Sequence, residues 1–104
     1  MSKFKVPESW LSSSRGASVI LLTSVLSGQE YANLGLNRLF KHYQFSQVDR
    51  HLTTQLVYGT LQHHLELSQD LAHLVLQWSK LPLAIQLVLE VALYQIRYLN
   101  RVPQ

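Results

Sequence analysis

The chain has 104 residues, of which 47% are hydrophobic and only 14% are charged, and its formal net charge is +3. It contains no cysteine, which excludes disulfides, thiolate zinc sites and cysteine nucleophiles. No segment is apolar over the length that a membrane-spanning helix needs, so we expect no membrane partner and a cytoplasmic location. A single small domain of this composition either buries an unusually large share of its surface or leaves apolar surface for a partner.

The first half of the chain predicts a tail and two helices. Residues 1–12 are expected to form a flexible N-terminal tail, because Pro7 and several serines disfavour a helix there. The first helix is predicted to begin at Ser13 or Ser14 as N-cap and to end at Gly28. Because almost every position between them is apolar, this helix should be nearly surrounded by protein. The second helix is predicted from about Tyr31 to Tyr43, and its inward face should hold Leu36, Leu39, Phe40 and Tyr43.

The third predicted helix contains a glycine on its buried face. Ser46 is the expected N-cap, and Asp49 three residues later completes a capping box. A glycine inside a helix costs roughly 1 kcal/mol relative to alanine, so we expect another helix to pass very close to Gly59. The residues expected on the buried face, at spacings of four, four and three, are Val48, Leu52, Leu56 and Gly59.

The last third of the chain predicts one or two further helices before a break at Pro82. Continuation of the third helix through His63-His64 is left open, with or without a kink. A stripe then resumes at Leu67, Leu71, Leu74 and Trp78. After Pro82, the last helix is predicted over about 83–99. Its inward residues should be Leu87, Val91, Tyr94 and Tyr98, with Gln86, Glu90, Arg97 and Arg101 on the other side. No stretch alternates as a strand would, so the predicted fold class is an all-α bundle of about five helices.

Several of these segments resemble one known family. The run from Asp49 to Leu61, D-R-x-x-x-T-x-L-V-Y-G-T-L, is similar to the central helix of the NusB-like domain. It is most similar to the version at the N-terminus of Sun-type ribosomal RNA cytosine-C5 methyltransferases. Residues 30–36, 91–99 and 101–103 agree with further family segments in order and spacing. The resemblance covers about residues 13–104 and implies a NusB-like helical domain that is incomplete at its C-terminus and lacks the last helices.

The resemblance implies an accessory RNA-binding domain of a 16S ribosomal RNA cytosine-C5 methyltransferase. The catalytic domain, with its S-adenosylmethionine, would then be a partner in cis. The chain itself lacks the glycine-rich strand-to-helix turn of such a cofactor pocket, so no catalytic, cofactor-binding or metal residue is expected in it. The alternative, from a different functional class, is a helical protein-interaction module. It would dock a catalytic domain or a ribosomal or antitermination partner and contact RNA little.

The candidate RNA contacts are basic residues scattered along the chain. Arg15 leads, because it matches the arginine-bearing start of the family's first helix, which the resemblance implicates in RNA contact. Arg50 is interpreted first as a partner of a neighbouring helix and second as a phosphate contact. The like-charged pair Arg97 and Arg101 indicates either an exposed edge or a place for an anion. The full candidate set is Arg15, Arg38, Lys41, Arg50, Arg97 and Arg101.

Three further expectations concern side chains that suggest other chemistry. His63 and His64 are adjacent and point apart on a helix, so we interpret them as surface or half-buried residues and not as metal ligands. Glu66 and Asp70, one turn apart, are interpreted as solvated surface and not as a catalytic pair. The apolar faces of the fourth and last helices are expected to lack cover, which predicts a homodimer through them.

Overall fold

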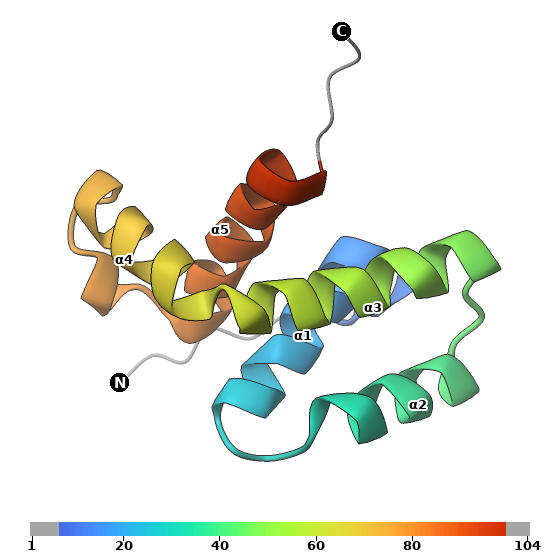
Figure 1. Ribbon diagram of the computed structural model, residues 1–104. Helices are drawn as coiled ribbons and strands as arrows, with labels where there is room; N and C mark the ends of the chain where they lie inside the picture. Colours follow the sequence, from blue (N-terminus) through green and yellow to red (C-terminus); the bar gives the residue numbers. More distant parts are fainter. Residues whose placement is uncertain (1–6, 100–104) are drawn as a thin grey trace, which may run out of the picture.

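The computed structural model describes residues 7–99, and this part of the chain is helical without any strand (Figure 1), which confirms the predicted fold class. The α-helices are α1 (Ser14–Leu26), α2 (Ala32–His42), α3 (Gln47–Gln62), α4 (His64–Leu74) and α5 (Leu83–Tyr94). Two 3-10 helices, η1 (Glu8–Ser12) and η2 (Trp78–Lys80), and a π-helical turn, η3 (Gln95–Leu99), complete the described elements. None of these helices combines the length and apolarity that crossing a bilayer requires.

Helix α1 lies at the centre of the arrangement. It packs most extensively on α3 and also contacts α5, α2 and η1, while α4 packs on α5. Leu22, Leu56, Leu67 and Leu87 come from four different helices and are completely buried. Burial of each such side chain contributes roughly 1.5–3 kcal/mol. The core therefore holds α1, α3, α4 and α5 together, and α2 covers one side of α1 and α3 (Figure 1).

The helix ends follow the capping signals of the sequence. Ser13 Oγ accepts a hydrogen bond from the amide of Gly16 at 3.0 Å, and Ser46 Oγ accepts one from the amide of Asp49 at 3.0 Å. Each cap satisfies an amide that the helix leaves without a partner. Just past α1, Gly28 adopts a left-handed φ of 78°, a conformation that glycine reaches without strain. The predicted N-caps and the stop at Gly28 are confirmed.

Gly59, where another helix was expected to pass very close, is contacted by the end of a side chain of α5. The glycine lies against Tyr94 of α5, and a Cβ atom there would overlap Cζ and the hydroxyl oxygen of the Tyr94 ring. Tyr94 stacks on Tyr98, with ring centroids 5.3 Å apart, and Tyr98 stacks on His63 at 4.1 Å. The glycine thus admits an aromatic ring that joins α3 to α5 and η3.

Four residues expected to face inward are exposed. The exposed fractions are 41% for Tyr43, 76% for Val48, 74% for Leu74 and 37% for Tyr98. Each lies at or near the end of its element: Tyr43 is the C-cap of α2, Val48 is in the first turn of α3, Leu74 ends α4, and Tyr98 lies in η3. The apolar periodicity of the sequence therefore extends beyond the residues that pack in the core.

Glu90 differs from its prediction in the opposite direction, because it is buried where exposure was expected. It was predicted on the solvent side of the last helix, yet only 1% of it is exposed. Helix α4 covers this side of α5, and His64 Nδ1 lies 2.7 Å from Glu90 Oε1. Burial raises the pKa of the Glu90 carboxyl above its ordinary value, and the hydrogen bond and charge of His64 oppose that rise. The pair explains how a carboxylate is accommodated between two helices.

The segment expected to be a tail contains η1. This turn packs on α1, and Trp10 lies against the core cluster. Ser12 Oγ donates to the carbonyl oxygen of Ser9 at 2.7 Å, which closes the turn. Residues 8–12 therefore belong to the folded body.

Candidate nucleic-acid interface

Three of the candidate RNA-binding residues lie on α2 and near the start of α3, two helices that a short turn joins (Figure 1). We call Arg38, Lys41 and Arg50 the basic corner. Arg38 and Lys41 are exposed residues of α2, and Arg50 is an exposed residue near the start of α3. The Arg50 guanidinium carbon lies 5.5 Å from the centroid of the Phe40 ring, over its face. This cation–π contact places Arg50 beside the ring whose chain neighbour is Lys41.

The basic corner keeps a positive charge. Among the described residues, neither Lys41 nor Arg50 forms an ion pair. Arg38 Nη2 lies 2.7 Å from Glu30 Oε1, yet 58% of the Arg38 side chain stays exposed. Asp49 lies in the first turn of α3, where the helix dipole favours a carboxylate. Within residues 7–99, Arg38 is thus the one member of the basic corner with a carboxylate partner, and Lys41 and Arg50 are available for phosphates.

Three aromatic residues, Phe40, Tyr43 and Phe45, lie in the same segment of the chain as these cations, and the Phe40 ring lies under Arg50. Phe40 and Phe45 pack edge to face, with centroids 5.5 Å apart and an angle of 65° between the rings. Tyr43, between them in sequence, is exposed. Unpaired RNA bases stack on such rings, and cations beside them contact the backbone. The corner therefore has both kinds of group that bind single-stranded RNA.

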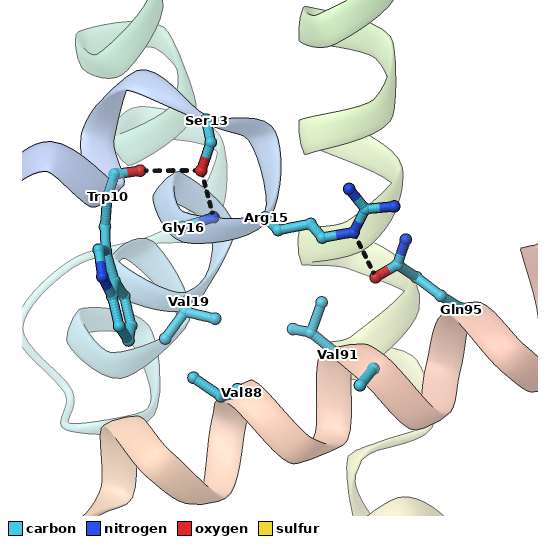
Figure 2. Close-up of a pocket in the computed structure, with 9 residues that line it drawn as sticks. Trp10, Ser13, Arg15, Gly16, Val19, Val88, Val91 and Gln95 are labelled. Carbon is cyan, nitrogen blue, oxygen red and sulfur yellow. Dashed lines mark hydrogen bonds between the residues drawn. The ribbon is translucent and has the colours of Figure 1, made fainter.

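Arg15 lies elsewhere, at the start of α1. Its Nε donates a hydrogen bond to Oε1 of Gln95 at 3.0 Å (Figure 2). It lines a pocket of about 290 Å³ between the start of α1 and α5, together with Trp10 and Val88. The next residue back, Ser14, donates to the carbonyl oxygen of Asp49 at 3.2 Å, which ties the start of α1 to the first turn of α3.

Arg97 contacts two carboxylates of α4. Its Nη1 lies 2.6 Å from Asp70 Oδ2 and 3.1 Å from Glu66 Oε2, and the Tyr98 hydroxyl also donates to Glu66. The hydrogen bond to Asp70 is the main cause of the raised pKa of Arg97. Glu66 and Asp70, interpreted from sequence as solvated surface, therefore attach η3 to α4. The candidate Arg101 lies outside the described residues.

The histidines have separate environments. His63 stacks on Tyr98, whereas His64 contacts Glu90. Among residues 7–99, no group of three His, Cys, Asp or Glu side chains is arranged to hold a metal ion. The two rings thus serve packing and pairing between helices.

Phe40, which lies under Arg50 of the basic corner, was not singled out from the sequence, because helical spacing marked it only as a core residue. A local signal was present. Basic and aromatic residues are interspersed from Phe40 to Arg50, on both sides of the turn before Ser46. Such interspersion is typical of surfaces that bind unpaired bases.

Comparison with known proteins places this geometry in context. The NusB family matches residues 12–104. A Bacillus subtilis (strain 168) protein named "Probable ribosomal RNA small subunit methyltransferase B" is 37% identical over 90 residues, which cover 86% of this chain and 20% of that protein. A Synechocystis sp. protein of the same name is 27% identical over 96 residues, covering 88% and 21%. The chain thus spans about a fifth of the length of these relatives. No solved structure matches it significantly.

Proposed function

Because the chain belongs to the NusB family, we propose that it is an accessory RNA-binding domain of a ribosomal RNA methyltransferase. The observation that carries the proposal is the basic corner, where Lys41 and Arg50 lie exposed without a carboxylate partner among residues 7–99, and where Arg50 lies over the Phe40 ring. The relatives' name supports small-subunit ribosomal RNA as the substrate, and the domain would act in the cytoplasm.

In this proposal, the methyl-transfer reaction takes place in another part of such a protein. Cytosine-C5 methyl transfer and the S-adenosylmethionine that supplies the methyl group would belong to a catalytic domain. The described residues contain no strand, and so lack the strand-to-helix turn that holds a nucleotide-type cofactor. We therefore assign no reaction step to this chain, only the holding of RNA.

The proposed binding mode combines phosphate contacts and stacking. Lys41 and Arg50 contact phosphates, Arg38 adds a third contact, and Tyr43 offers a ring to an unpaired base. Arg15 is a further candidate, because the start of α1 adjoins the start of α3. Arg97 contributes least, since two carboxylates offset its charge, and Arg101 stays a candidate.

Salt dependence tests the proposal. Fluorescence anisotropy of a short labelled single-stranded RNA is measured at several salt concentrations. Three phosphate contacts predict a slope of log affinity against log salt of about −2, because each contact on a single strand contributes about −0.7. The double variant Lys41→Gln/Arg50→Gln should lose about 1.4 of this slope.

The matched control is Lys80→Gln. Lys80 is exposed in η2, away from the basic corner, and forms no ion pair in the described part of the chain. It should leave affinity and slope unchanged. The proposal would be contradicted by an RNA affinity that does not change with salt concentration. It would also be contradicted by an equal loss of affinity in the basic-corner variant and the control variant.

A further inference from the structure

A pocket at the turn between α1 and α2 adjoins the basic corner. It has a volume of about 600 Å³, and Arg38 of the basic corner forms part of its wall. The rest of the lining comes from the end of α1, the turn and the start of α2, and includes Val25, Gln29, Glu30, Tyr31 and Leu34. In Figure 1 this turn lies at the bottom of the view, whereas η3, the last described element, lies near the top. We call this hollow the turn pocket.

Tyr31 offers the turn pocket an aromatic ring that is not packed in the core. It is 75% exposed, more than any other Phe, Tyr or Trp side chain among residues 7–99. It is also the N-cap of α2, a position that favours Ser, Thr, Asp or Asn, and its side chain makes no capping hydrogen bond. Tyr31 thus neither fills the core nor caps its helix. An exposed ring near a cation is what unpaired bases stack on.

Arg38 is fixed in the wall of the turn pocket. Its Nη2 lies 2.7 Å from Oε1 of Glu30, whose side chain is only 14% exposed. Gly35 leaves room for this carboxylate, since a Cβ atom at that position would come within 3.1 Å of Glu30 Cδ. A guanidinium has several N–H donors, so Arg38 can still bind a phosphate while Glu30 holds it in place.

The turn pocket and the basic corner lie along one exposed face of α2. Its residues recur at spacings of three, four and three, and all of them are exposed: Tyr31, Leu34, Arg38 and Lys41. From Tyr31 to Lys41 this face is about 15 Å long. A short single strand whose phosphates contact Lys41 therefore reaches the turn pocket.

We propose that the turn pocket holds one unpaired base of a single-stranded RNA whose phosphates contact the basic corner. The base stacks on Tyr31, the exposed amide of Gln29 bonds to its edge, and Arg38 contacts the adjoining phosphate. This inference rests on the proposed function and adds a base subsite to it. A base fits this lining better than an apolar protein helix does, because a carboxylate, a guanidinium and an amide lie in the wall beside the ring.

The fluorescence of 2-aminopurine tests the stacking, because this base analogue is quenched when it stacks on another ring. The probe is a single-stranded RNA of about seven nucleotides that carries the analogue at one position, which differs between otherwise identical molecules. We expect added quenching on binding that depends on Tyr31 at one position. Tyr31→Leu should abolish it and weaken RNA binding about fivefold to a hundredfold. The slope of log affinity against log salt should not change, because no phosphate contact is lost.

Two further variants make the result specific. Tyr58→Leu removes a ring of α3 that is 45% exposed and lies outside the lining of the turn pocket, so it should leave quenching and affinity unchanged. Tyr31→Phe keeps the ring and should retain both. Circular dichroism of each variant shows that the helical fold is kept.

The possible failures of this inference and of the proposed function are distinguishable. RNA binding with the expected salt slope, but with equal effects of Tyr31→Leu and Tyr58→Leu, would overturn the base subsite and leave the basic corner standing. Quenching that persists in Tyr31→Leu and is lost in Tyr43→Leu would also overturn it, by placing the base at the end of α2. Absence of RNA binding at every salt concentration would overturn both proposals.

Discussion

Gly59→Ala adds one methyl group to α3 where it meets Tyr94 of α5. In an isolated helix the change would stabilise by about 1 kcal/mol. Here the methyl overlaps the Tyr94 ring, which is buried and stacked on Tyr98, so it cannot move without disturbing its neighbours. Overpacking of this kind costs about 1–3 kcal/mol. We expect the free energy of unfolding to fall by about 1–2 kcal/mol, from the upper part of that range less the propensity gain.

A second background separates the two effects. Tyr94→Leu removes Cζ and the hydroxyl, the atoms that the new methyl would meet. In that background Gly59→Ala should raise the free energy of unfolding, by up to about 1 kcal/mol. Urea unfolding of the four proteins gives the coupling energy, expected at about 2 kcal/mol. If alanine stabilises or destabilises equally in both backgrounds, Tyr94 is not the reason for the glycine.

Three further predictions concern the His64–Glu90 pair, the N-cap of α3 and the candidate RNA contact Arg97. Burial raises the folded pKa of Glu90 above the ordinary 4.5, so its contribution to stability is complete below that pH and is lost as pH rises through the folded pKa. The amide oxygen of Glu90→Gln still accepts a hydrogen bond from His64. The urea midpoint of this variant, relative to that of the wild type, should therefore rise between pH 4.5 and 7.5. Midpoints that change in parallel with pH would contradict this. Ser46→Ala should cost about 1 kcal/mol in the same assay, against less than about 0.5 for exposed Ser79→Ala. Arg97→Ala should leave RNA anisotropy unchanged, because Glu66 and Asp70 offset this charge; a loss like that of the basic-corner variants would show that we misplaced the interface.

Local chemistry made the first three helices predictable. A serine hydroxyl that satisfies a free amide marks a helix start whatever packs around it, so Ser13 and Ser46 were identified correctly. Gly28 past α1 marks a stop for an equally local reason. Gly59 also predicted a contact with another helix, because a residue that disfavours a helix is expected on a buried face only where a neighbour leaves no room for a side chain.

The sequence pattern could not predict contacts between helices distant in the chain. Glu90 looks like a solvent-facing residue until α4 is placed over α5 and His64 meets it. Arg97 looks like a free cation until the same packing brings two carboxylates to it. Arg50 was expected to contact a neighbouring helix, and the contact in the structure is with the Phe40 ring of α2 and not with an acid. In each case the partner lies on another helix, and the periodicity of one helix does not show which residues of another helix pack against it.

Mapping RNA onto the folded chain tests the central claim most directly. Amide chemical shifts of the isotope-labelled protein are recorded while a short single-stranded RNA is added. We predict that the largest shifts fall in residues 38–51, from the end of α2 through the start of α3, and that they shrink as salt is raised. Shifts confined to α4 or α5, or no shifts at saturating RNA, would contradict an RNA-binding role for the basic corner.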